Sequence, residues 1–169
     1  MERLQVLAGE MADCLQLHHL EREKLMMLVQ RHDIGKVTVP DEILLKPGPL
    51  TKHEWAIVKK HSETGYRLAN SIGELRGIAD LILYHHENYD GNGYPRGLKE
   101  NEIPFLSRLL AILDAFDVMT HDQVYKEAVS EDVALERLEL NAGTQFDPEL
   151  VKTFIHMRIS KVCEEKNVP

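Results

Sequence analysis

The chain has 169 residues, a length that suits one domain with a single core. Its formal net charge of -8 and its pI of about 5.6 argue against a broad basic face for polymeric nucleic acid, so an anionic small substrate would need local cations. Two cysteines are too few for a disulfide framework or a thiolate metal cage, and no stretch approaches the roughly 20 apolar residues of a membrane span. These features predict a cytoplasmic protein without a membrane span.

The first half of the chain shows helical periodicity. Apolar residues at three- and four-residue spacing predict one helix over 4–15 and a second helix that runs through residue 31. Gly35 is expected to end this second helix. Thr51 and Glu54 form a capping-box pattern, which predicts a helix whose apolar side begins at Trp55 and which contains His61.

The second half continues this pattern. Residues 74–84 are expected to form a helix that delivers His85 and His86, and a Gly- and Pro-containing loop over 91–104 is long enough to fold over a cleft. An apolar helix from about residue 106 carries Asp114, and Ser130 and Asp147 mark two further helix starts. No segment alternates with period two for more than a few residues, so we expect an all-α fold with about seven helices around one core.

Histidines and aspartates gather at the ends of these elements or among apolar residues. An isolated pair such as His85 and His86 is often only surface or capping chemistry, but other segments supply matching groups. Asp114 lies among apolar residues, where an unpaired carboxylate is costly to bury. The combined set predicts a two-metal site without sulfur: His32, Asp33, His61, His85, His86 and Asp114. Imidazole and carboxylate ligands suit iron, manganese, zinc or cobalt.

A phosphate chemistry follows from this ligand set. Asp33 could bridge two ions, and a metal pair can activate water and stabilise an in-line displacement at phosphorus. Lys36 is three residues after Asp33 and could neutralise a phosphate oxygen, although the two residues could also form a simple surface ion pair.

These residues carry a resemblance to a known family. The motif His-Asp-Ile-Gly-Lys at 32–36 and the stretch at 85–95, which contains His-His-Glu and Gly-Tyr-Pro, resemble the HD-GYP family of bacterial phosphodiesterases. The resemblance covers essentially the whole chain and includes the segments 43–48, 116–117 and 143–148. It implies an HD-superfamily helical bundle over 1–169 that hydrolyses cyclic di-GMP to linear pGpG, with GMP as a further product.

The resemblance also implies roles for single residues. The six residues of the predicted site become ligands of two divalent ions, expected to be iron or manganese, with a third ion found in some family members. Lys36 and Asp33 become catalytic, whereas Lys36, Tyr94 and Lys126 bind substrate. Asp117 is expected to support the ligands from behind them.

The sequence departs from the family pattern in two places. The family commonly supplies a further histidine and a glutamate on its first helix, and that position falls before Met1. Gln123 and Val124 stand where the family usually has an arginine and a proline. Three hypotheses therefore stand: a cyclic di-GMP phosphodiesterase, a degenerate HD-GYP module that binds nucleotide or a partner protein without turnover, and an HD-type hydrolase for another nucleotide.

The start of the sequence lies inside a helical pattern with no visible N-cap. We therefore expect a fragment of a longer chain with an N-terminal sensory or receiver domain, as the family resemblance implies. A homodimer is one of the assemblies that the sequence allows.

Overall fold

The computed structural model describes residues 2–122 and 128–165, with side chains as far as residue 160. Every regular element in these ranges is a helix, and the only extended pairing there is an isolated bridge between Ala142 and Phe146. The same ranges contain nine α-helices, of which seven have eight or more residues, and three short 3-10 helices. The predicted all-α fold of about seven helices is confirmed.

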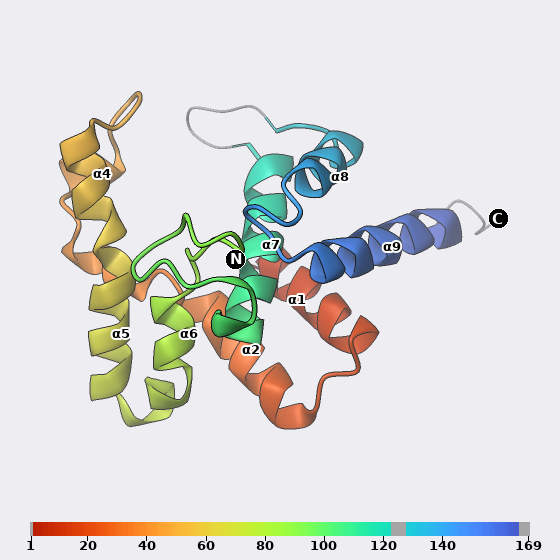
Figure 1. Ribbon diagram of the computed structural model, residues 1–169, viewed down its shortest axis with the longest axis horizontal. Helices are drawn as coiled ribbons and strands as arrows, with labels where there is room; N and C mark the ends of the chain where they lie inside the picture. Colours follow the sequence, from red (N-terminus) through yellow and green to blue (C-terminus); the bar gives the residue numbers. More distant parts are fainter. Residues whose placement is uncertain (1, 123–127, 166–169) are drawn as a thin grey trace.

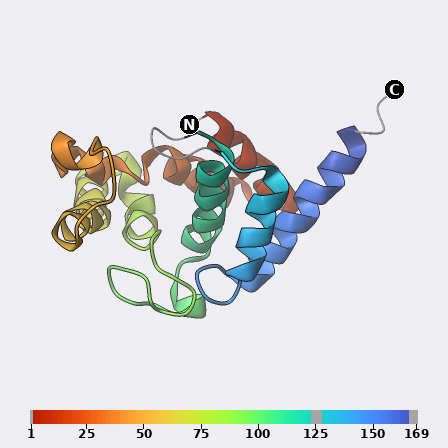
Figure 2. The same cartoon turned by 90° about the horizontal axis from the view of Figure 1, so that it is seen from above.

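The helices are arranged in three neighbouring groups (Figures 1 and 2). At one end lie α4, α5 and α6, in the middle α7 runs beside α1 and α2, and at the other end are α8 and α9. The α-helical bounds are α1 (Glu2–Cys14), α2 (His19–Arg31), α3 (Asp41–Leu44), α4 (Lys52–Lys59), α5 (His61–Ser71), α6 (Ala79–Leu83), α7 (Phe105–Thr120), α8 (Glu131–Leu140) and α9 (Pro148–Glu165). The 3-10 helices are η1 (Ile34–Thr38), η2 (Gly73–Ile78) and η3 (Glu100–Glu102).

The central helix α7 contributes most to the hydrophobic core. Its buried side chains meet those of α1, α2, α8 and α9 in one cluster, and burial of this apolar surface is the main source of stability. The rings of Phe116 on α7 and Phe154 on α9 pack edge to face at 5.0 Å. Asp147 caps α9 by accepting the backbone N–H groups of Glu149 and Leu150, and it also pairs with Arg108 of α7. The predicted start of the last helix is therefore confirmed.

The capping box at Thr51 is confirmed, but the helix that it begins is shorter than expected. The Thr51 hydroxyl accepts the Glu54 N–H at 3.2 Å, and the Glu54 carboxylate accepts the Thr51 N–H at 2.6 Å. The helix α4 ends at Lys59, and His61 begins a separate helix, α5. The expectation that Trp55 joins the core-facing side is wrong: its side chain is 48% exposed, whereas Val58 is buried.

The segment 74–84 was expected to be one helix and is instead two short elements. Residues 73–78 form the 3-10 helix η2, and the five-residue α6 follows it. Glycines at 73 and 77 lower the α-helical propensity of this segment, which explains the break.

The prediction that Gly35 ends the second helix is also wrong. The helix α2 ends at Arg31 with His32 as its C-cap, and Gly35 lies inside η1. A side chain at position 35 would collide with the backbone of α5, because a Cβ there would lie 2.5 Å from the nitrogen of Gly65 and closer still to the carbonyl oxygen of His61. Glycine therefore allows η1 to pack directly on α5.

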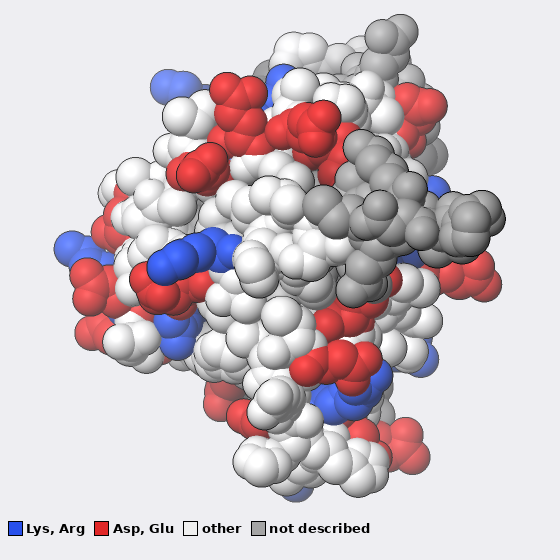
Figure 3. All heavy atoms as spheres, turned by 90° about the vertical axis from the view of Figure 1, so that its right-hand side faces the viewer, with Lys and Arg blue, Asp and Glu red and all other residues white. Residues whose placement is uncertain are grey.

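The surface of the described residues carries charges of both signs. Acidic and basic side chains are interspersed on the described part of the face shown in Figure 3. None of the described helices combines the length and the apolar character that a membrane crossing requires.

Candidate metal centre

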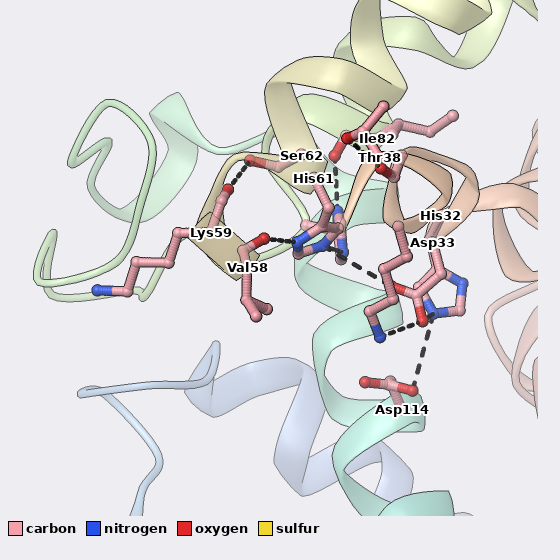
Figure 4. Close-up of polar contacts among 12 residues, drawn as sticks. His32, Asp33, Thr38, Val58, Lys59, His61, Ser62, Ile82 and Asp114 are labelled. Atoms are coloured by element: carbon pink, nitrogen blue, oxygen red, sulfur yellow. Dashed lines mark hydrogen bonds and ion pairs between the residues drawn. The ribbon is translucent and has the colours of Figure 1, made fainter. Parts of the chain in front are cut away.

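The ends of several helices converge on one place (Figure 4). His32 and Asp33 follow the end of α2, and His61 begins α5. His85 and His86 follow α6, and Asp114 lies in the middle of α7. The structure thus brings together all six residues of the predicted set.

Four of these residues form a compact group. One ligand atom from each of Asp33, His61, His85 and His86 lies within 4.8 Å of the others. The side chains of His61 and His85 are almost fully buried, whereas Asp33 is partly exposed. Buried imidazoles around a partly open carboxylate are an arrangement that holds a divalent ion.

A second group shares Asp33 with the first. The Nε2 atom of His32 lies 3.5 Å from Oδ2 of Asp33 and 3.9 Å from Oδ1 of Asp114. The other oxygen of Asp33, Oδ1, lies 3.7 Å from Nε2 of His61. The two oxygens of one carboxylate therefore face two different sets of ligands.

The hydrogen bonds of three histidines fix which ring nitrogen is available. In each of His32, His61 and His85, Nδ1 contacts the backbone carbonyl three residues earlier, at 3.0, 2.7 and 2.6 Å respectively. A carbonyl oxygen only accepts, so Nδ1 must carry the hydrogen, and in the neutral ring Nε2 presents its lone pair. This pattern of Nδ1 donation is the usual way in which proteins orient metal-binding histidines.

The spacing of two of these lone pairs tests whether a cation fits. The Nε2 atoms of His61 and His85 lie 3.4 Å apart, and both are acceptors when their Nδ1 atoms donate. Burial lowers the pKa of His61 and, together with the charges of His86 and His32, lowers that of His85 well below its ordinary value. Burial, with the neighbouring His61 and Lys36, lowers the pKa of His86 to about 3. The rings stay unprotonated at neutral pH, so a metal ion is the cation that suits this donor set.

The two aspartates have pKa values that shift in opposite directions. Burial alone would raise the pKa of Asp33, but the positive charges of His32 and Lys36 outweigh it and the pKa falls below its usual range. Burial, with the negative charges of Asp33 and Asp117, raises the pKa of Asp114. Lys36 donates from Nζ to Oδ2 of Asp33 at 2.6 Å, so the predicted contact between these two residues is confirmed.

The loop after α6 is held by a buried carboxylate that the sequence reasoning did not single out. Glu87 accepts the backbone N–H groups of Arg96, Gly97 and Leu98 at distances between 2.7 and 3.2 Å. The folded loop places the ring of Tyr94 4.9 Å from that of His86, at an interplanar angle of 27°. The signal in the sequence was an acidic residue directly between the histidine pair and the glycine-rich turn.

The metal-ligand cluster opens into a cavity of about 870 Å³. Lys36 and Tyr94, both predicted to bind substrate, line it, as do four of the six predicted ligands. The cavity also has lining residues that the sequence reasoning missed: Lys52, Trp55 and Lys59 of α4, with Asn88, Asn92 and Gln145. Their signal was the spacing of 52, 55 and 59, which places the three α4 side chains on one face of a helix.

Two predicted site residues are not placed among the ligands. The carboxylate of Asp117 contacts Arg3 at 3.5 Å and His121 at 3.2 Å, so its expected role behind the ligands stays a prediction. Lys126 lies outside the described residues, and so do Gln123 and Val124.

An all-helical domain whose helix ends assemble histidines around a His-Asp pair defines the HD class of metal-binding domains. Residues 1–150 match the family model described as HD domain, and the chain belongs to this family. The chain is 37% identical over 158 residues to a cyclic di-GMP phosphodiesterase of Thermotoga maritima, with 92% of this chain and 43% of that protein covered. It is 39% identical over 167 residues to the cyclic di-GMP phosphodiesterase response regulator RpfG of Xanthomonas campestris, with 96% and 44% covered.

Solved structures agree with the fold. An HD-GYP-like protein, Bd1817 of Bdellovibrio bacteriovorus, matches with a TM-score of 0.71 at 20% identity, over 94% of this chain and 50% of that one. The HD domain of PgpH from L. monocytogenes, in complex with cyclic di-AMP, matches with a TM-score of 0.59 at 16% identity, over 99% and 90%. The predicted HD-superfamily bundle and the resemblance to HD-GYP proteins are confirmed.

The chain spans less than half the length of these two curated relatives. The expected sensory or receiver domain therefore stays a prediction.

Proposed function

We propose that the domain is a metal-dependent phosphodiesterase that hydrolyses cyclic di-GMP to linear pGpG. The observation that carries this proposal is the shared carboxylate of Asp33, whose two oxygens face two sets of ligands, with four of the six ligands lining a cavity of about 870 Å³. The names of the most similar relatives support the substrate, since two of them are cyclic di-GMP phosphodiesterases.

The residues divide into two metal-binding groups that share Asp33. His61, His85 and His86 would hold one divalent ion, and His32 with Asp114 would hold the other. Bound ions of this kind lower the pKa of water and withdraw negative charge from a phosphate. We propose iron or manganese, the metals that the family resemblance implies; both accept mixed imidazole and carboxylate ligands, as do zinc and cobalt.

The remaining groups position the substrate. Lys36 lies beside Asp33 and lines the cavity, so its ammonium group can contact a phosphate oxygen and stabilise the charge that develops during displacement. Tyr94 lies over His86 on the folded loop and closes one side of the cavity. Burial and the charge of Asp33 raise the pKa of Tyr94, so its hydroxyl remains protonated and can donate a hydrogen bond.

Hydrolysis of cyclic di-GMP by the metal-loaded chain tests the proposal, with pGpG and GMP separated by chromatography. Lys36→Ala should retain the bound metal and lose about 100-fold in kcat, because one charge-stabilising donor is removed. Undiminished turnover in that variant would remove Lys36 from the mechanism. Parallel assays with 3'3'-cGAMP and cyclic di-AMP test substrate choice, since a relative of 35% identity in Vibrio cholerae is named a 3'3'-cGAMP-specific phosphodiesterase.

A binding module without turnover is the second candidate. Gln123, in place of the arginine common in the family, favours it because a fork-shaped phosphate donor is missing. Tight nucleotide binding by a fully metal-loaded protein that releases no product would support this candidate over the enzyme.

A further inference from the structure

One face of α4 forms a wall of the cavity that the metal chemistry does not use. Lys52, Trp55 and Lys59 lie three and four residues apart, and all three line the cavity. The side chain of Lys59 extends from α4 away from His61 (Figure 4), and its Nζ lies 5.0 Å from the centre of the Tyr94 ring.

The exposure of Trp55 requires an explanation. Its side chain is 48% exposed, although the same helix buries Val58. Large aromatic side chains that remain exposed in a concave, mixed polar surface commonly bind ligands, because a planar apolar group there is covered only when the ligand arrives. Trp55 is also the only tryptophan in the chain.

The charge of this wall is opposite to that of the whole protein. The chain carries a net charge of -8, yet α4 presents two lysines to the cavity. Among the described side chains, neither Lys52 nor Lys59 forms an ion pair. Along α4, Trp55 lies between Lys52 and Lys59. An aromatic side chain with lysines on either side is complementary to a nucleobase that carries a neighbouring phosphate.

We propose that the α4 wall binds the half of the dinucleotide that is not being cleaved, with Trp55 stacked on its guanine base and Lys52 and Lys59 facing its phosphate. The inference rests on the proposed dinucleotide substrate. A cyclic dinucleotide has two phosphates, so when one lies at the metal ligands the other lies elsewhere in the cavity, where a nearby positive charge would stabilise it. The α4 lysines supply that charge.

The single tryptophan makes the contact directly observable. Rapid mixing of the metal-loaded protein with cyclic di-GMP should give a saturable decrease in tryptophan fluorescence before turnover, because a stacked guanine quenches the indole. GMP should quench at higher concentration, and ribose 5-phosphate, which has no base, should not. Rapid mixing with cyclic di-GMP at concentrations well above the KM measured for its hydrolysis, without any change in fluorescence, would overturn the proposal.

Kinetics of variants give an independent test. Trp55→Ala should raise KM for cyclic di-GMP about 10-fold with most of the effect in KM rather than kcat, and Trp55→Phe should restore most of the affinity. The double variant Lys52→Ala/Lys59→Ala should also raise KM and should weaken its dependence on salt. Lys60→Ala is the matched control, because this exposed neighbour does not line the cavity and should leave KM unchanged.

The outcomes separate this inference from the proposed function. A native KM in Trp55→Ala, with hydrolysis intact, would refute the stacking contact and leave the enzyme standing. Quenching of the native chain without hydrolysis would refute the enzyme and support the α4 wall as a nucleotide-binding surface. If the native chain shows neither quenching nor hydrolysis, both proposals fail.

Discussion

Substitution of Gly35 by alanine should disconnect the two halves of the metal centre. The new Cβ would lie 2.5 Å from the backbone nitrogen of Gly65 and closer still to the carbonyl oxygen of His61. Ordinary contact begins at 3.4 Å, so η1 must move away from α5 by more than about 1 Å. Asp33 is the N-cap residue of η1 and Lys36 lies within it, so both would move with Gly35 away from His61. Metal-ligand distances tolerate only about ±0.2 Å, so this displacement exceeds what the shared carboxylate can absorb.

The expected result is a stable protein with an impaired site. Overpacking of this kind costs about 1–3 kcal/mol, which corresponds to a fall in Tm of about 2–12 °C for a chain of this size. Metal content by elemental analysis should fall, and hydrolysis should fall with it, while the far-ultraviolet circular dichroism stays helical. Gly73→Ala is the control, because nothing lies within 4 Å of its added Cβ. A Gly35→Ala protein with native metal content and native turnover would refute the argument.

Three further predictions concern single groups. His85→Ala should remove a ligand, so bound metal should fall and turnover should fall with it by about 100-fold. Substitution of the exposed His53 by alanine is the control and should change neither, and equal losses in the two variants would contradict the prediction. Glu87→Gln should weaken the charge-assisted hydrogen bonds from three backbone N–H groups of the loop, lower the free energy of unfolding by about 2 kcal/mol and raise KM while metal stays bound. A thermal melt and a KM equal to those of the native protein would refute it. The metal-free protein should lose stability as pH falls from about 7 to 5. The pKa of His86 is lowered to about 3 in the folded protein, whereas the unfolded ring takes up a proton near pH 6.5, so acid favours unfolding. Thermal melts of His86→Asn should show a weaker pH dependence, and an unchanged slope would contradict the assignment.

The sequence predicted the ligand set because five of its six members sit at positions that carry their own signal, whereas His61 was included only as part of the combined set. His32 and Asp33 follow the end of a periodic helix, and His85 and His86 precede a glycine-rich turn. Where the ends of several helices converge, the residues at those ends can meet at one place (Figure 4). Asp114 was indicated by its apolar surroundings, and the structure confirms that it lies beside His32.

The cavity walls were harder to predict. Trp55 follows a capping box, and helical spacing alone cannot distinguish an apolar side chain that faces the core from one that faces a cavity. The role of Gly35 depends on the approach of η1 to α5, a contact between segments separated in the sequence. The anchoring role of Glu87 depends on the path of a loop that local patterns do not define.

Metal content tests the central claim most directly, measured by elemental analysis on anaerobically purified protein together with cyclic di-GMP hydrolysis by the same sample. The shared carboxylate of Asp33 predicts two ions per chain and release of pGpG. Fewer than two ions in an active protein would contradict the two-group assignment, and two ions without turnover would contradict the proposed enzyme.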